Sequence, residues 1–414
     1  MSANTLWTGA EAATATGGRN THNWHATGAS IDSRTTTKGD LFVAIEGPVF
    51  NGHEFIGAAF ANGAAAGLVS TVPNTLPETN PLHIVDNTTA ALTALGAASR
   101  ARTSARITAV TGSVGKTGTK EALRHVLEAQ GPTSASRLSL NNHWGVPLSL
   151  ARMPAETAFG IFEVGMNHAG EIEPLSRLIR PHVAIVTTVE AAHLENFDSI
   201  EAIADAKSEI FAGLASEGTA VLNRDNQFFG RLADAARRYG VTDIVAFGAA
   251  NESDVRLLDL TLSHDHSDIS AEICGQRIEF RLGVVGRHWV MNSLAVLAAV
   301  GALGADVKAA ARALAEFEEL DGRGKLHRVT IGEAKITLID ESYNANPASV
   351  LAALEILGQT VPEGDGRRIV VLGDMRELGR LSADFHRTVA EQLLTNNIDL
   401  AFACGPDMAA MVEK

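Results

Sequence analysis

Apolar positions recur along this chain with two periods, and the two periods predict two kinds of element. Short β-branched or apolar runs are typical of buried strands, and longer segments with apolar residues three or four apart are typical of helices. The short runs predict strands at residues 41–45, 107–111, 158–164, 183–189, 336–339, 369–372 and 400–403, with a β-rich patch at 255–285. The longer segments predict helices at residues 88–102, 120–130 and 290–305. This alternation indicates an α/β protein built on mostly parallel sheets.

The turn between the strand at 107–111 and the helix at 120–130 carries a chemical signature, TGSVGKT over residues 111–117. In a phosphate-binding loop, glycines let backbone N–H groups close around a polyphosphate, the lysine reaches the β- and γ-phosphates, and the threonine hydroxyl binds Mg²⁺. Val110 stands where the pattern G-x-x-x-x-G-K-[ST] has its first glycine, so we expect a tighter variant of the loop. The nucleotide-binding residues expected from this loop are Gly112, Ser113, Gly115, Lys116 and Thr117.

The chain has 414 residues, which is too long for one hydrophobic core, and the pattern divides it into three predicted domains. Residues 1–103 form a small α/β domain that ends in the alanine-rich helix. Residues 104–318 form a central P-loop domain with a parallel sheet. Residues 319–414, with a linker at 321–324, form a Rossmann-like domain.

Composition narrows the class of function. A formal charge of -14 argues against a general nucleic-acid or membrane-surface binder, so local basic groups and metal must hold any anionic ligand. Cys274 and Cys404 lie far apart and form neither a disulfide framework nor a zinc spacing. The first residues show no secretory pattern, and the apolar stretch at 290–305 is short and carries Asn292 and Ser293. We therefore expect a cytoplasmic protein that acts on small molecules.

Three further residues have two interpretations each. Glu163 follows a strand, at the edge where open α/β sheets place ligands, and its carboxylate could complete a Mg²⁺ shell begun by Thr117. A solvated residue or a helix cap is the alternative for Glu163. His193 follows the strand at 183–189, although lone histidines are usually structural, and the periodicity around Lys207 by itself predicts a surface lysine. The residues alone leave these alternatives open.

A series of motifs runs in order through nearly the whole chain. They are DSR with GDLFVAIEG and NGHEF (32–55), TGSVGKTGTKE (111–121), NNHWGVPLSL (141–150), EVGMNHAGEI (163–172), AHLENFDSIEAIADAKSEIF (192–211), LNRDN (222–226), GRHWVMNSLAV (286–296), ESYNANP (341–347) and VLGDMRELG (371–379). Together they resemble the motifs of the Mur ligase family, ATP-dependent amide-bond ligases of peptidoglycan synthesis. Folylpolyglutamate synthetases share the phosphate loop, whereas the last two motifs are similar to the branch of the family that adds D-alanyl-D-alanine.

The resemblance implies roles for the residues named above. Lys116 would hold the phosphates, and Thr117 and Glu163 would hold a first Mg²⁺. His193 would hold a second Mg²⁺ together with Lys207. In this family that lysine is carbamylated by CO₂, which turns a cation that would repel the metal into a carboxylate-like ligand.

The remaining motif positions imply contacts with the nucleotide and the substrates. The implied contacts are Asn292 for adenine, Arg323, Asp340 and Glu341 for the rest of the nucleotide, Ser33 and Arg34 for the uridine-diphosphate end, Asn141 and Asn142 for the muramoyl peptide, and Asn344 and Asn346 for the incoming dipeptide. Family members usually have two aspartates before SYNANP. Glu341 departs from that pattern, so the ribose contact could fall on either acid.

The resemblance implies an activity: ligation of D-alanyl-D-alanine to UDP-N-acetylmuramoyl-tripeptide, with ATP and two Mg²⁺ ions, through an acyl phosphate. Such an enzyme serves cell-wall biogenesis, cell shape and cell division, and a monomer is expected. Two rivals stay open, namely another Mur or folylpolyglutamate-type ligase and a nucleotide-binding remnant that does not ligate. Chains that resemble this one usually continue beyond the strand at 400–403, so we also expect an incomplete third domain, either in a fragment or in a compromised protein.

Overall fold

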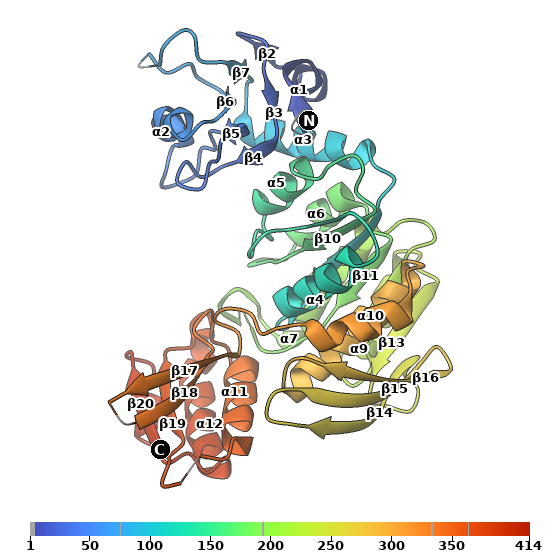
Figure 1. The fold of residues 1–414 in the computed structure, drawn as a ribbon, viewed down its shortest axis with the longest axis vertical. Helices are drawn as coiled ribbons and strands as arrows, with labels where there is room; N and C mark the ends of the chain where they lie inside the picture. The colour runs from blue at the N-terminus through green and yellow to red at the C-terminus, as the bar shows by residue number, and fades with distance from the viewer. Residues whose placement is uncertain (1–4, 75, 193, 333, 363) are drawn as a thin grey trace.

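The computed structural model describes residues 5–74, 76–192, 194–332, 334–362 and 364–414. In Figure 1 the chain forms three regions, with the N-terminal region at the top, the central region in the middle and the C-terminal region at the lower left. Each region has its own strands and its own buried apolar clusters. The predicted α/β class with parallel sheets is confirmed.

The first region contains a small sheet with strand order β2-β7-β6-β5-β4, in which β4 to β7 are parallel and β2 is antiparallel. Strands β1 and β3 form a separate antiparallel pair. Helix α3 ends the region, and its buried face packs together with helix α5 of the central region. The elements are β1 (Trp7–Thr8), α1 (Gly9–Thr16), β2 (Arg19–Asn20), β3 (His25–Ala26), β4 (Gly28–Ser30), β5 (Asp40–Val43), η1 (Gly52–Phe55), α2 (Ile56–Ala61), β6 (Ala66–Val69), β7 (Leu82–Ile84) and α3 (Thr88–Ala101).

The central region is built on a large sheet, whose strand order within the described residues is β16-β15-β14-β13-β12-β11-β8-β10-β9. Strands β8 to β14 are parallel, and β14 to β16 form an antiparallel meander at one edge. Its elements are β8 (Arg106–Thr111), α4 (Lys116–Glu128), β9 (Thr133–Ala135), α5 (Gly145–Ala151), β10 (Phe159–Glu163), α6 (Ile172–Ile179), β11 (Val183–Val186), η2 (Leu194–Asn196), α7 (Ile200–Ser208), η3 (Glu209–Gly213), β12 (Thr219–Asn223), α8 (Phe229–Arg238), β13 (Asp243–Gly248), β14 (Val255–Leu262), β15 (Ser267–Ile273), β16 (Gln276–Leu282), α9 (Arg287–Ala302), α10 (Val307–Ala313) and η4 (Leu314–Glu316).

Helices cover both faces of the large sheet, which explains why its central strands are continuous apolar runs. Helices α4, α9 and α10 share one buried cluster with the sheet, and α5, α6, α7 and α8 share another with the opposite face. Strand β8 lies between β10 and β11, so the segment that follows it leaves from the middle of the sheet. Open parallel sheets place ligands at this carboxyl edge.

Helix α4 begins at Lys116, four residues earlier than the apolar pattern predicted. Gly115 precedes the helix with φ of 83°, a left-handed conformation that glycine adopts without strain. The first turn, residues 116–119, has the sequence KTGT and no apolar side chain, so apolar periodicity could not detect it. In the same way, α9 begins at Arg287 instead of residue 290, and β11 ends at Val186 instead of residue 189.

The third region consists of two strand pairs and the helices that pack on them. Strands β17 and β18 are antiparallel, and β19 and β20 are parallel. The predicted strand at 336–339 therefore pairs with β17, which the sequence pattern did not predict, and not with β19. The elements are β17 (Lys325–Ile331), β18 (Ala334–Asp340), α11 (Pro347–Gln359), β19 (Ile369–Gly373), η5 (Gly379–Leu381), α12 (Ser382–Thr395), β20 (Leu400–Cys404) and α13 (Ala409–Val412).

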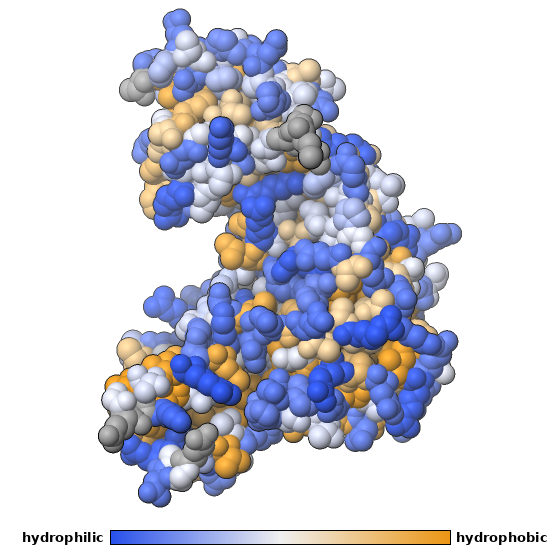
Figure 2. Space-filling view, viewed as in Figure 1, coloured by the Kyte–Doolittle hydropathy of each residue, from blue (hydrophilic) through white to orange (hydrophobic). Residues whose placement is uncertain are grey.

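The surface of the three regions differs. Figure 2 shows a deep indentation between the first and third regions and apolar side chains gathered over the third region. Val371 and Phe402, on its parallel strands, are 74% and 54% exposed. The boundaries predicted after residues 103 and 318 fall between α3 and β8 and between η4 and β17. Among the described residues, we find no helix with the length and apolar character of a membrane span.

Candidate active site

The segment between β8 and α4 forms a tight loop that only glycine can build at two positions. Gly112 has φ of 152°, and a Cβ there would lie 1.9 Å from Thr187 Oγ1. A Cβ on Gly115 would lie 2.8 Å from Asn292 Oδ1 on helix α9. Lys116 folds back over the loop, and its Nζ donates to the Gly112 carbonyl at 2.7 Å and to the Ser113 carbonyl at 3.3 Å. The loop thus concentrates positive charge at the start of a helix, where anions bind.

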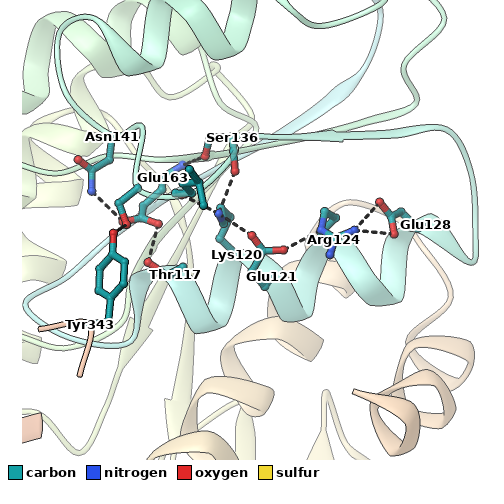
Figure 3. Close-up of polar contacts among 11 residues, drawn as sticks. Thr117, Lys120, Glu121, Arg124, Glu128, Ser136, Asn141, Glu163 and Tyr343 are labelled. Carbon is teal, nitrogen blue, oxygen red and sulfur yellow. Dashed lines mark hydrogen bonds and ion pairs between the residues drawn. The ribbon is translucent and has the colours of Figure 1, made fainter. Parts of the chain in front are cut away.

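Glu163 ends β10 directly beside this loop and is almost fully buried, with 1% of its surface exposed. Its carboxylate accepts from the Thr117 hydroxyl at 2.9 Å and from Asn141 Nδ2 at 2.8 Å, as Figure 3 shows. Its backbone N–H donates to Ser136 Oγ at 3.1 Å. The alternative interpretation of Glu163 as a solvated residue is therefore wrong.

Lys207, on helix α7, is 2% exposed, so the interpretation of this residue as a surface lysine is also wrong. Burial lowers the pKa of the Lys207 ammonium well below its ordinary value, and the charge of Lys116 lowers it further. Burial also lowers the pKa of Lys116, although the Glu163 carboxylate opposes that shift. His193, predicted as the partner of Lys207, lies outside the described residues.

The third region approaches the loop through the residues around its first strands. The Tyr343 hydroxyl donates to Ser139 Oγ at 2.6 Å, and the Arg323 guanidinium lies 4.1 Å from the centre of the Tyr343 ring. Burial raises the pKa of Glu341 to about 7, although the nearby charge of Arg323 lowers it. The neighbouring Asp340 has a lowered pKa because Ser342 donates to its carboxylate. Arg323, Asp340 and Glu341 therefore lie in one charged group beside Tyr343.

Other predicted substrate contacts lie apart from the loop or are engaged locally. Arg34 is exposed and pairs with Asp32 at 2.7 Å, in the first region near the buried Ser33. Asn142 accepts from the Gly145 N–H at the start of α5, and Asn346 accepts from the Ser349 N–H at the start of α11. Asn344 is exposed. Asn346 caps α11, and the oxygens of both Asn142 and Asn346 already accept from backbone N–H groups.

Sequence reasoning missed a cavity of about 380 Å³ between the start of α9 and helix α11. Its lining includes Glu190, Asn226, Arg287, His288, Glu355 and Gln359. Ser113 joins this cavity to the loop, because its hydroxyl donates to the Glu190 carbonyl at 3.0 Å and accepts from the Glu190 N–H at 2.9 Å. Burial raises the pKa of Glu190 and lowers the pKa of His288 to about 4. Glu190 lies outside all the motifs quoted above, so no motif indicated this position.

An aromatic ring packs against Gly118, one residue after Thr117. A Cβ on Gly118 would lie 2.7 Å from the Trp289 ring, which is 5% exposed. The same ring packs edge-on against Phe317, with 5.6 Å between ring centres. Trp289 therefore closes the space between the first turn of α4 and the end of the central region.

The donor set suits a hard divalent cation. A hydroxyl and a buried carboxylate, Thr117 and Glu163, meet at the point where nucleotide phosphates would lie, and oxygen ligands of this kind bind Mg²⁺. Across the described residues, no three His, Cys, Asp or Glu side chains converge on a metal position. A Mg²⁺ ion held here would therefore complete its shell with phosphate oxygens and water, which is its usual arrangement at nucleotide sites.

Comparison with known proteins gives consistent matches along the chain. Residues 25–122 match the Mur ligase family catalytic domain, residues 110–300 the Mur ligase middle domain, and residues 322–414 the glutamate ligase domain of Mur ligases. The chain is 36% identical over 384 residues to UDP-N-acetylmuramoyl-tripeptide--D-alanyl-D-alanine ligase of Escherichia coli, covering 92% of this chain and 82% of that protein. It is 34% identical to the protein of the same name in Rickettsia prowazekii, covering 88% of this chain and 79% of that protein.

Solved structures agree. MurF from Acinetobacter baumannii has a TM-score of 0.86 and 30% identity, with 98% of this chain and 87% of that chain covered. MurF ligase from Thermotoga maritima, solved in complex with ADP, has a TM-score of 0.77 and 27% identity, with 93% and 86% covered. By its sequence, its domain matches and its fold, the chain belongs to the Mur ligase family.

Proposed function

We propose that this protein is an ATP-dependent ligase that joins D-alanyl-D-alanine to UDP-N-acetylmuramoyl-tripeptide in peptidoglycan synthesis. The observation that carries the proposal is the arrangement of Lys116, Thr117 and Glu163 around one tight loop. The relatives that cover most of this chain bear the name of this ligase, which supports the choice of acceptor and donor. A cytoplasmic location follows from the proposal, because ATP and a nucleotide-linked precursor are its substrates.

The reaction needs the terminal carboxylate of the tripeptide to become an electrophile. An oxygen of that carboxylate attacks the γ-phosphorus of ATP, the bond from phosphorus to the β–γ bridging oxygen breaks, and ADP leaves. The amine of D-alanyl-D-alanine then attacks the acyl carbon, loses a proton, and displaces inorganic phosphate. Lys116 neutralises charge on the transferring group, and the loop holds the reactants in line. Mg²⁺, when bound by Thr117 and Glu163, supplies further charge neutralisation at the phosphates.

We include carbamylation of Lys207 in the proposal. Its lowered pKa leaves a larger fraction of the amine unprotonated, and the unprotonated Nζ can form a bond to the carbon of CO₂ while a proton is released. The product is an anion in place of a cation. This change would relieve the repulsion from Lys116, which adds to the effect of burial in lowering the pKa of Lys207.

We assign one substrate to each predicted domain. Residues 1–103 would bind the uridine-diphosphate end through Ser33 and Arg34, and residues 104–318 would bind ATP, with Asn292 at the adenine. Residues 319–414 would bring the dipeptide. The contact between Tyr343 and Ser139 supports the last assignment, because Tyr343 directly precedes residues 344–346 and Ser139 lies two residues before Asn141, whose side chain donates to Glu163. A monomer stays a prediction.

A phosphate-release assay with UDP-N-acetylmuramoyl-tripeptide and ATP tests the proposal, run with and without D-alanyl-D-alanine. We expect sustained release only when both substrates are present. Release with glutamate or diaminopimelate as the acceptor, in place of the dipeptide, would assign the chain to another ligase of this type. Binding of ATP without release under any condition would identify a non-ligating nucleotide-binding protein. Glu163→Gln is the matched negative control, because it keeps the shape of the side chain and removes the charge that we propose binds Mg²⁺.

A further inference from the structure

Lys120, one helical turn beyond Lys116 on α4, is fully buried and has a full set of acceptors. Its ammonium donates to the Ser136 carbonyl at 2.8 Å and to the Leu138 carbonyl at 2.9 Å. It also pairs with the Glu121 carboxylate at 2.7 Å. An ammonium has three N–H groups, so each one has an oxygen partner. Figure 3 shows Lys120 beneath the chain segment that carries Ser136.

The charge of Lys120 is balanced along the helix and not at the nucleotide site. The second oxygen of Glu121 accepts from Arg124 Nε at 2.7 Å, and Arg124 also pairs with Glu128 at 2.9 Å. Burial raises the pKa of Glu121, but the hydrogen bonds from Lys120 and Arg124 outweigh burial, and the pKa is lowered. The Lys120 Nζ is therefore held by local acceptors, whereas the Lys116 Nζ donates to loop carbonyls that a phosphate can replace.

The segment that Lys120 anchors, residues 136–141, contacts the active site at three points. Ser136 Oγ accepts from the Glu163 N–H, and Asn141 Nδ2 donates to the Glu163 carboxylate. Ser139 Oγ accepts from the Tyr343 hydroxyl of the third region. The same short segment thus positions the carboxylate opposite Thr117 and receives the third region.

Lys120 contacts the segment at Leu138, a residue with an unfavourable backbone conformation. Leu138 has φ of 51° and a side chain that is 78% exposed, so a residue with a Cβ occupies a left-handed conformation without burial to stabilise it. That conformation turns the Leu138 carbonyl inward to Lys120. A charge-assisted hydrogen bond to this carbonyl offsets the cost of the turn.

We propose that Lys120 is a positioning residue of the ligase: its ammonium holds residues 136–141 in the turn that aligns Glu163 with Thr117 and presents Ser139 to Tyr343. This proposal rests on the proposed ligase activity for its kinetic consequences, but its structural part does not. Lys120 touches no reacting atom, and it acts through Ser136 and Leu138.

The first experiment measures amide hydrogen exchange in the metal-free, nucleotide-free protein. In Lys120→Met, which keeps the length of the side chain, we expect exchange at residues 136–141 and at the Glu163 amide to rise about tenfold, because a charge-assisted anchor is lost. Exchange elsewhere in α4 and in the first region should match the parent. The matched control is Lys308→Met, since Lys308 is an exposed lysine on helix α10. Unchanged exchange at 136–141, or an equal rise throughout the chain, would overturn the proposal.

The second experiment separates positioning from binding. Lys120→Met should lower kcat about 10- to 100-fold and raise the Mg²⁺ concentration needed for half-activation, as changes behind a metal ligand do. The KM for ATP should stay within about twofold, since Lys116 and the loop backbone are unchanged. A loss in ATP binding that equals the loss in kcat would contradict a positioning role. An inactive parent in the phosphate-release assay would refute the ligase activity and leave the exchange result standing.

Two further variants keep the proposal testable if Lys120→Met does not fold. Ser136→Ala removes only the hydroxyl that accepts from the Glu163 N–H, and it should reproduce a smaller share of the kcat and Mg²⁺ effects. Leu138→Gly makes the left-handed turn inexpensive, so it should restore part of the activity of Lys120→Met. Parent-like kinetics in Ser136→Ala, or no restoration by Leu138→Gly in a folded double variant, would count against the mechanism.

Discussion

The central and third regions of the molecule differ in how deeply their strands are buried. Five consecutive positions of β8, residues 107–111, are buried in the large sheet. Strand β19 of the third region alternates between exposed and half-buried positions, and four of the five positions of β20 are exposed. Strands covered on both faces cannot move independently of their helices, whereas the described strands of the third region have one open face.

The difference assigns different roles to the two regions. Lys116 and Thr117 come from α4, which packs on the large sheet, and Glu163 comes from β10, a strand covered on both faces, so the geometry of the proposed phosphate site is set before substrates bind. The third region supplies Tyr343 and Arg323 through a few surface contacts, including the backbone hydrogen bond from Glu195 N to the Glu377 carbonyl at 3.1 Å. Contacts of this kind open easily, which suits the domain closure that we expect for the proposed reaction.

The strongest test of the division is to remove the charge at the centre of the rigid site. Lys116→Ala should lower kcat about 1,000-fold, because Lys116 is the only cationic side chain in residues 111–117 and stabilises the transferring phosphoryl. Phosphate release measures the loss, and calorimetry should show a folded protein with little change in melting temperature. Lys308→Ala on the exposed face of α10 serves as the control. Near-normal turnover in Lys116→Ala would contradict the assignment of the loop.

The next effect concerns Lys207, which is buried on helix α7. If it becomes a carbamate, Lys207→Ala should lose about 100-fold in kcat, and short carboxylic acids should restore part of it by filling the vacated position. The parent should also respond to added bicarbonate. Activity within a small factor of the parent, without a bicarbonate response, would leave Lys207 as a buried lysine with no metal role.

The next effect is on stability: a leucine-to-alanine substitution should lower the free energy of unfolding more in the central region than in the third. Leu123 on α4 is fully buried, and Leu338 on β18 is 51% exposed. Leu123→Ala should lower the free energy of unfolding by about 2–5 kcal/mol through the cavity that it leaves. Leu338→Ala should change it by less than about 0.5 kcal/mol. Chemical denaturation of both variants measures the contrast, and equal losses would show that the third-region sheet is more tightly packed than its exposure indicates.

The smallest effect is a pH dependence confined to the third region. Burial raises the pKa of Glu341 to about 7 from an ordinary value of 4.5. Between these values the folded state keeps a proton that the unfolded chain has released, so the free energy of unfolding should fall as pH rises from 4.5 to 7. Glu341→Gln should remove about 1 kcal/mol of this fall, allowing for solvent screening of a partly exposed group. Urea titrations across this range would refute the prediction if both proteins gave the same slope.

The sequence predicted the elements with strong apolar periodicity and the order in which they alternate. It placed the start of α4 wrongly because the turn that carries Lys116 and Thr117 is polar and begins at a left-handed glycine. It left Glu163 and Lys207 undecided, since a single charged residue at a strand end or in an amphipathic helix is usually exposed. Burial came from the packing of neighbouring strands and helices, which no local pattern encodes.

Lys120 could not have been identified from the sequence. Its acceptors are backbone carbonyls of Ser136 and Leu138, and carbonyls leave no trace in residue identity. The left-handed turn at Leu138 lacks the glycine or asparagine that would have signalled it. The oxygens of Asn142 and Asn346, expected to face substrates, accept from backbone N–H groups at helix starts, a role that asparagine fills in many contexts.

The packing of Trp289 over Gly118 gives the protein an intrinsic fluorophore at its catalytic loop. The chain has four tryptophans, and Trp7, Trp24 and Trp144 lie in the first region or pack against its core. Trp289 packs against Gly118 in the first turn of α4 and is shielded from water. Emission from this indole can therefore be followed in rapid-mixing experiments without a label, and replacing the other three tryptophans with phenylalanine would leave one signal that reports the occupancy of the loop in real time.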